Sequence, residues 1–182
     1  MWWQWLLSIS RDRNPALDRT GKNFNVNQLD PNVLFLAGVL AGSGSVERTI
    51  MMNKGKAILF PIINFITSYA EEPSLKSEEE LLFYAKSNID DIAKKEASIN
   101  GINFRNIETY RVQSKVFTLI FPEDNVYGLE PGSTIGASDG YWIFLKPLRT
   151  GKYDICTIGS CLSGRITINV TLHLEVKPTY LA

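Results

Sequence analysis

The sequence predicts a mainly β protein, an antiparallel β-sandwich or jelly roll, formed as a single domain over residues 1–182. Three observations predict this class. Turn signals recur through the second half of the chain at the spacing of about 8–12 residues that is typical of sandwiches. The last apolar segment alternates strictly between apolar and polar residues, as a strand with one buried face does. Helical and strand patterns do not alternate along the chain, which argues against a doubly wound parallel sheet.

The composition is that of an ordinary globular chain, with 45% hydrophobic and 21% charged residues. It excludes a disordered tail, a collagen-like fibre and a coiled-coil rod. The 19 basic and 19 acidic residues give a net charge of zero. Nucleic acid is therefore not expected as a partner, because phosphate binding needs a surplus of lysine and arginine on one face. No apolar run approaches the roughly 20 residues of a membrane-spanning helix, so no membrane span is expected.

The N-terminus predicts a short helix. Trp2 and Trp5 are three residues apart, and Leu6 continues the same face. The segment 14–32 that follows is polar and rich in Asn, Asp and Gly, so it is expected to be a loop.

Two apolar runs in the first half of the chain predict strands. The first spans 33–37 and is expected to form a hairpin with 48–52, across a glycine-rich turn at 38–44. The second spans 57–63 and contains Pro61. Because proline cannot donate a hydrogen bond to a neighbouring strand, this run is expected to be an edge strand or to carry a bulge.

One longer helix is predicted at 76–95, inserted between the strands. Ser77 and Glu80 have the spacing of a capping box, in which each side chain satisfies a backbone amide of the first turn. One apolar stripe follows at helical intervals, made of Leu81, Ala85, Ile89 and Ile92. Lys94 and Lys95 stand at the expected C-terminal end, where positive charge suits the helix dipole.

The second half predicts a series of short strands. Asn100 and Gly101 favour a tight hairpin turn, because both residues tolerate positive φ. A loop is expected at 122–138. Strands are expected at 110–112, 116–121, 141–145, 152–158 and 165–176. The apolar face of the last strand is expected to form the core of the sandwich.

Metal and cofactor chemistry find little support in the sequence. The chain has two cysteines, Cys156 and Cys161, and one histidine, whereas a structural zinc site needs four ligands. The spacing of the cysteines leaves open a disulfide or two thiols. His173 falls on the polar phase of the last strand and is expected to point away from the core, as a surface residue rather than a catalytic base. No nucleophile elbow or phosphate-binding loop is present, and no metal or cofactor is expected.

Carboxylates are then the acid–base groups in supply. Glycoside hydrolysis needs two carboxyl groups about 5–10 Å apart across a cleft. Asp139 and Glu72 are the candidate catalytic pair for a hydrolase or lyase acting on a polysaccharide. Other carboxylates considered are Asp18, Glu71, Asp90 and Asp91. The competing interpretation is that these groups are solvated or bonded within loops.

Flat aromatic side chains are the more suggestive feature. Trp3, Tyr141 and Trp142 are candidates for stacking on a sugar ring or for contacting a protein partner. Asn64 directly follows an apolar run and Asp139 precedes another, so both are expected as polar anchors at the rim where loops gather. The competing interpretation assigns the tryptophans to the core.

Several blocks stand in a fixed order along the chain. They include Trp2-Trp3-Gln4-Trp5, Phe60-Pro61-Ile62-Ile63-Asn64 and Asp139-Gly140-Tyr141-Trp142. With shorter blocks between them, they resemble a family of predicted secreted proteins of bacteria, archaea and some fungi over residues 2–176. The resemblance implies export, with a leader removed before Met1, and implies no particular reaction. Two positions that hold cysteine in the family hold Phe24 and Ile50 here, so the family's disulfide is not expected.

The sequence as a whole predicts a secreted or cell-surface β-sandwich that binds a carbohydrate or a protein partner. One alternative is the carboxylate-dependent hydrolase or lyase, so the sequence alone does not decide whether the protein is an enzyme. A second alternative is a structural subunit that assembles through an unpaired edge strand, which would accept a segment from a neighbouring copy.

Overall fold

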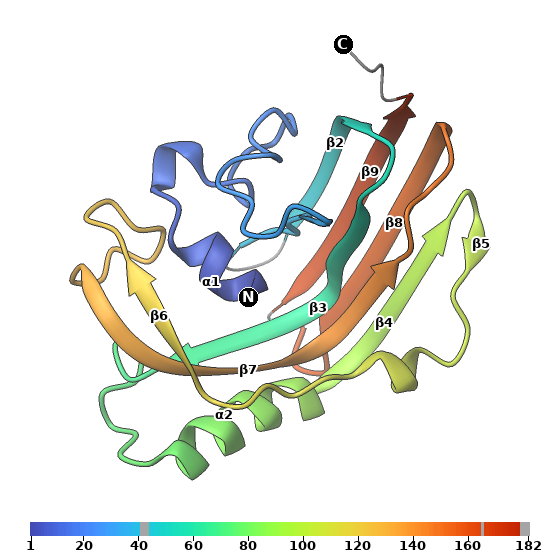
Figure 1. Ribbon diagram of the computed structural model, residues 1–182. Coiled ribbons are helices and arrows are strands. Elements are labelled where there is room, and N and C mark those ends of the chain that lie inside the picture. Colours follow the sequence, from blue (N-terminus) through green and yellow to red (C-terminus); the bar gives the residue numbers. More distant parts are fainter. Residues whose placement is uncertain (41–43, 165, 179–182) are drawn as a thin grey trace.

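Two packed β-sheets form most of the molecule, as the sequence predicts (Figure 1). A computed structural model describes residues 1–40, 44–164 and 166–178. Within these residues, sheet A has four strands in the order β1-β3-β7-β6, and sheet B has five in the order β2-β9-β8-β4-β5. The fold is thus mainly β and sandwich-like, with one inserted helix and one N-terminal helix.

The elements have the following bounds. Sheet A contains β1 (Val33–Phe35), β3 (Ala57–Ser68), β7 (Gly132–Leu145) and β6 (Phe117–Phe121). Sheet B contains β2 (Gly44–Asn53), β9 (Thr167–Lys177), β8 (Gly151–Cys161), β4 (Ile92–Ile99) and β5 (Ile102–Asn103). The helices are α1 (Trp2–Leu7) and α2 (Glu78–Asp90), with 3-10 turns η1 (Arg11–Arg13) and η2 (Ile107–Tyr110). No helix in these ranges is both long and apolar enough to cross a membrane.

Both sheets are mixed, which corrects the prediction of purely antiparallel pairing. β1 runs parallel to β3, and β2 runs parallel to β9 with Val46 opposite Val170. The predicted hairpin of 33–37 with 48–52 is wrong, because β1 and β2 lie in different sheets. β2 buries alternate residues and pairs with β9 along its whole length. Residues 41–43 of the predicted turn lie outside the described residues.

β3 is a central strand rather than an edge strand. It lies between β1 and β7, and the pairing register slips between Pro61 and Ile63. A bulge leaves one residue out of the ladder, so it accommodates a proline that has no N–H to donate. The alternative of a bulged strand is therefore confirmed. Beyond the bulge, Asn64 lies opposite Gly140.

α2 is shorter than the predicted 76–95. The capping box between Ser77 and Glu80 is present, and Leu81, Ala85 and Ile89 form its buried stripe. The helix ends at Asp90, and residues 92–95 belong to β4, where Ile92 pairs with Cys161 of β8. Pairing with β8 thus replaces the last turn of the predicted helix, and the two lysines do not cap a helix.

β7 extends through a segment predicted as loop. Residues 132–138 were expected to be irregular because of their glycines, but they pair with both β6 and β3. A Cβ at Gly136 would lie 2.7 Å from the carbonyl oxygen of Thr67, and one at Gly140 would lie 2.5 Å from the Cβ of Asn64. These glycines therefore permit close approach of β3 instead of marking turns.

The predicted strand at 110–112 is also absent. Residues up to Tyr110 form η2, and Arg111 makes a single bridge with Tyr141. The hairpin turn at Asn100-Gly101 is confirmed, with Ile99 opposite Ile102 and positive φ at both turn residues.

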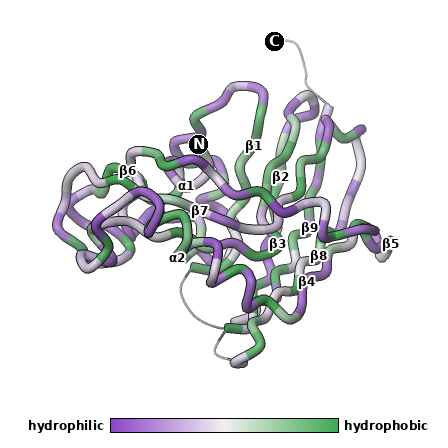
Figure 2. Tube along the Cα trace, turned by 90° about the horizontal axis from the view of Figure 1, so that it is seen from below, coloured by the Kyte–Doolittle hydropathy of each residue, from purple (hydrophilic) through white to green (hydrophobic). Residues whose placement is uncertain are grey.

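The last strands form the core as predicted. β8 and β9 are antiparallel neighbours, although residue 165 of the predicted last strand lies outside the described residues. Hydrophobic and hydrophilic residues alternate along sheet B (Figure 2). The buried residues of β9 are Val170, Leu172, Leu174 and Val176.

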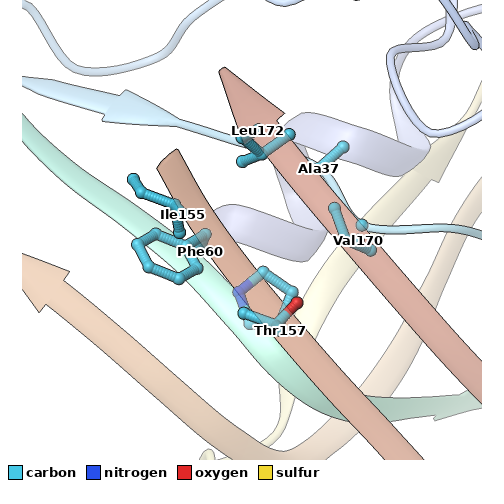
Figure 3. Close-up of a pocket in the computed structure, with 8 residues that line it drawn as sticks. Ala37, Phe60, Ile155, Thr157, Val170 and Leu172 are labelled. Atoms are coloured by element: carbon cyan, nitrogen blue, oxygen red, sulfur yellow. The ribbon is translucent and has the colours of Figure 1, made fainter. Parts of the chain in front are cut away.

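The space between the sheets is closely packed. A void there has a volume of about 10 Å³, enough for about one water, and is lined by residues of both sheets (Figure 3). Its lining includes Phe60 of β3, Ile155 and Thr157 of β8, and Val170 of β9. Around these residues the two sheets are therefore closely packed, and the void offers no room for a ligand.

α1 and α2 lie on opposite faces of sheet A (Figure 1). Successive residues of a strand point to opposite faces. Ala137 of β7 packs with the buried stripe of α2, whereas the next residue, Ser138, accepts a hydrogen bond from Trp3 of α1. The two faces of sheet A therefore pack against different helices at this point of β7.

Candidate functional site

The predicted stacking aromatics are mostly buried. Trp3 is 6% exposed and its indole N–H donates to Ser138 Oγ at 2.8 Å. Tyr141 is 3% exposed, its hydroxyl donates to Glu108 at 3.0 Å, and the Lys95 ammonium lies 5.1 Å from its ring centre. Trp142 is half-buried and is the one of the three that keeps a substantial exposed surface. The structure therefore brings Trp3 and Trp142 to one face of sheet A and Tyr141 to the other.

Asp139 is held in a buried ion pair. Its carboxylate is 1% exposed and accepts from Arg111 Nε and Nη2, the latter at 2.7 Å. Arg111 Nη1 also lies 2.7 Å from Asp90, and the two carboxylates raise the pKa of Arg111. Paired in this way, Asp139 anchors Arg111.

Glu72, the other half of the candidate catalytic pair, has a different partner. Its carboxylate accepts a hydrogen bond from the Tyr84 hydroxyl at 3.1 Å. Within the described residues, Arg111, which holds Asp139, forms no hydrogen bond to either residue. Burial and this hydrogen bond raise the pKa of Tyr84. The structure does not bring Glu72 and Asp139 into a shared hydrogen-bond network.

A cavity of about 410 Å³ lies between β3, the C-terminal end of α2 and the start of β9. Its walls are mainly apolar, with isoleucines from β3, α2 and β9. The residues with polar groups on this lining, which define the interior cavity, are Trp3, Asn64, Glu71, Asn88, Asp91 and Tyr127. A cavity of this size and mixed lining is typical of sites that bind small molecules.

Asn64 reaches the interior cavity from the strand just beyond the bulge of β3. Its Nδ2 atom is buried and has no hydrogen-bond partner among the described residues. A buried donor without an acceptor costs about 1–3 kcal/mol, so an acceptor from a ligand would remove this penalty. The prediction that Asn64 and Asp139 lie at strand ends on the rim is wrong, because both lie within strands, Asn64 in β3 and Asp139 in β7; Asn64 instead lines the cavity.

Glu71 is a carboxyl group of the cavity lining whose pKa burial strongly raises. It follows the end of β3, and the hydroxyl of the fully buried Ser68 donates to its Oε2 at 2.8 Å. Burial raises the pKa of Glu71 to about 7, with a smaller contribution from the charge of Glu72, while the bond from Ser68 opposes the rise. At neutral pH this carboxyl group can therefore both donate and accept a proton.

The interior cavity is acidic. Its described lining includes the carboxyl groups of Glu71 and Asp91 and contains no lysine, arginine or histidine. Burial raises the pKa of Tyr127, and the charge of Glu71 adds to the effect. The lining therefore favours a neutral or cationic group over an anion.

A second hollow of about 450 Å³ lies on the α1 side of sheet A. Its lining, which defines the aromatic groove, includes Trp2, Trp3, Phe117, Trp142, Ser114 and Lys115. Trp3 lines the groove and also the interior cavity. Two of the predicted stacking residues, Trp3 and Trp142, therefore meet in this groove.

The remaining candidates lie elsewhere. His173 points away from the core as predicted, with Nδ1 2.7 Å from Asp154 and Nε2 2.7 Å from Glu47. Cys156 and Cys161 are not joined by a disulfide, because five residues along β8 place them on opposite faces and about 16 Å apart. Within the described ranges, no three or more His, Cys, Asp or Glu side chains group so as to hold a metal ion.

Comparisons with family models, with characterised proteins and with solved structures found no match. The function is therefore inferred from the geometry of this chain alone. Sequence reasoning named Glu71 only among several carboxylates and did not single it out. Its distinguishing feature is burial against Ser68, which depends on how β3 ends and on what packs over it.

Proposed function

We propose that this protein binds a small, mainly apolar organic molecule with a hydroxyl head group in the interior cavity. One observation carries the proposal. A single cavity combines apolar walls, the unpartnered buried amide of Asn64 and the carboxyl group of Glu71, whose pKa lies near 7. The binding role predicted from the sequence is kept, but it moves from exposed aromatics to the cavity.

A hydroxyl group fits both polar anchors. Its oxygen can accept from Asn64 Nδ2, and its hydrogen can be donated to the carboxylate of Glu71. An anionic head group would meet two carboxyl groups and no base in the described lining. A carbohydrate is a poorer occupant, because its many hydroxyls would face apolar walls without partners. A secreted or cell-surface location, which the family resemblance implies, is part of the same proposal.

Binding of matched probes tests this proposal. Cyclohexylmethanol and cyclohexanecarboxylate have the same ring and differ in the head group. We expect the alcohol to raise the melting temperature and to change tryptophan fluorescence, since Trp3 lines the cavity. At pH 8, we expect the carboxylate to bind the cavity at least about fivefold more weakly, because Glu71 and Asp91 repel it.

Three variants locate the site. Asn64→Ala and Glu71→Gln each remove one anchor, and we expect each to weaken binding of the alcohol. Glu130→Gln is the matched control, because Glu130 is exposed and is not part of the cavity lining. Absence of alcohol binding at millimolar concentration, or binding that neither anchor variant changes, would contradict the proposed function.

A further inference from the structure

The floor of the aromatic groove is rigid and presents carbon surface. Trp2 packs edge-on against Trp3 and Trp142, with ring centres 5.0 and 5.3 Å apart. The Trp2 indole N–H donates to the carbonyl of Leu36 at 3.1 Å, and that of Trp3 donates to Ser138 Oγ. Both indole N–H groups are thus occupied inside the protein. Such a floor is already ordered before a ligand arrives, which lowers the entropy cost of binding.

The polar groups of the groove are donors. Ser138 Oγ accepts from Trp3, and Ser114 Oγ accepts from the backbone N–H of Ser138 at 2.9 Å. A hydroxyl that accepts still has its own hydrogen to donate. Lys115 is exposed and adds an ammonium group that forms no ion pair with any described carboxylate. The described lining of the groove contains no aspartate or glutamate.

These features point to an anionic ligand with a flat apolar body. We propose that the aromatic groove is a second binding site, separate from the interior cavity, which takes a small aromatic carboxylate. The ring lies against Trp142 and Phe117, and the carboxylate accepts from Lys115 and from the two serine hydroxyls. Charge complementarity selects this occupant, because the Lys115 ammonium and two hydroxyl donors adjoin apolar surface and the described lining has no carboxylate. The hydroxyls of a neutral sugar would outnumber the polar partners available there.

The first test compares an acid with its neutral counterpart. 2-Naphthoate and 2-naphthylmethanol share a ring system, and binding is followed by isothermal titration calorimetry. We expect the wild-type protein to bind 2-naphthoate. We expect binding to weaken as the salt concentration rises, because the Lys115 ammonium is exposed. We expect Lys115→Gln to weaken 2-naphthoate about tenfold, the size of one charge-assisted contact, and to leave 2-naphthylmethanol unchanged. Lys152→Gln, an exposed lysine of β8 in the other sheet, is the matched control and should change neither.

The test separates this site from the interior cavity. Glu71→Gln should leave 2-naphthoate binding in the groove intact even if the cavity binds nothing. The second site is overturned by a Lys115→Gln variant that binds 2-naphthoate as tightly as wild type, or by no binding of 2-naphthoate at millimolar concentration. Self-association in sedimentation experiments that Trp142→Ala abolishes, in a protein that binds no 2-naphthoate, would assign the groove to a second copy of the chain and would also overturn the proposal.

Discussion

The interior cavity and the aromatic groove share Trp3 and are similar in volume, about 410 and 450 Å³, but they differ in charge. The described cavity lining carries carboxyl groups and no base, whereas that of the groove carries a lysine and no acid. Volume and apolar area therefore do not decide what each hollow accepts. In our proposals the polar groups of each lining decide this, and they come from different segments of the chain. These groups are Asn64 and Glu71 for the cavity, and Ser114, Lys115 and Ser138 for the groove.

Substitution of Trp3, which lines both hollows, should have the largest effect on stability and on binding. Trp3→Ala removes a 6% exposed indole, and such truncations cost about 3–5 kcal/mol of unfolding free energy. Because Trp3 lines both hollows, we expect the variant to lose binding of cyclohexylmethanol and of 2-naphthoate together. Urea unfolding and both titrations measure this. Loss of one ligand with full retention of the other would show that Trp3 is not a common wall.

The next effect should distinguish the two hollows. Arg111→Gln leaves the buried Asp139 without its cation, which costs about 3–5 kcal/mol in comparable pairs. The segment after Arg111 is tied to β7, since Val112 N–H donates to Gly140 and Ser114 N–H donates to Ser138. It forms a wall of the groove and not of the cavity. We therefore expect weaker 2-naphthoate binding and unchanged alcohol binding, at a temperature where the variant is folded. Arg105→Gln, at an exposed position, is the control.

Glu71 makes stability depend on pH. Its pKa in the folded state is about 7, against 4.5 for the ordinary group, so the folded protein holds the proton through a range in which the unfolded chain has released it. The free energy of unfolding should therefore fall as pH rises from 4.5 to 7, by at most about 3 kcal/mol, and then level off. Glu71→Gln should remove this fall. Urea unfolding at pH 5 and pH 8 measures it, and an identical pH dependence in both proteins would contradict the assignment.

The smallest effect lies outside both hollows, at His173. Hydrogen bonds from its ring to Asp154 and Glu47 raise the pKa of His173 above its usual 6.5. This stabilisation is present below pH 6.5 and is lost as pH rises through the higher value of the folded state. Because the His173 ring is largely exposed, we expect His173→Gln to lower the free energy of unfolding by only about 0.2–1 kcal/mol at pH 6, and to leave it unchanged at pH 9. It should leave both ligands unaffected, and a change in either titration would connect sheet B to the hollows.

Local sequence signals predicted elements whose cause is local. The strict alternation in β9 predicts its buried face because a strand repeats every two residues, and the capping box predicts the start of α2. The predicted C-terminal end of α2 was wrong. Ile92 pairs with Cys161 of β8, a strand about 70 residues further along the chain, and local sequence does not show this pairing. The glycines of β7 predict a loop when the sequence is considered alone. In the fold they allow β3 to approach closely, which depends on the pairing of the two strands.

The candidate sites depend mainly on contacts between segments that are distant in the sequence. Asn64 was expected at the rim beyond the end of a strand, but it lies within β3, so its position on the cavity wall depends on the fold. The burial of Glu71 could not be predicted, since Ser68 and the apolar walls come from segments that meet only in the fold. The predicted stacking role of Tyr141 depended on an exposed ring, whereas β4 and η2 place Lys95 and Glu108 against it.

The most direct test is a titration of the Glu71 carboxyl carbon by NMR, in the free protein and with saturating cyclohexylmethanol. A midpoint near pH 7 in the free protein is expected, as burial of the carboxyl group requires. The alcohol should lower this midpoint, because a hydroxyl that donates to the carboxylate stabilises its charged form. A midpoint near pH 4.5 in the free protein, or one that the alcohol does not move, would contradict the assignment of the cavity as a binding site.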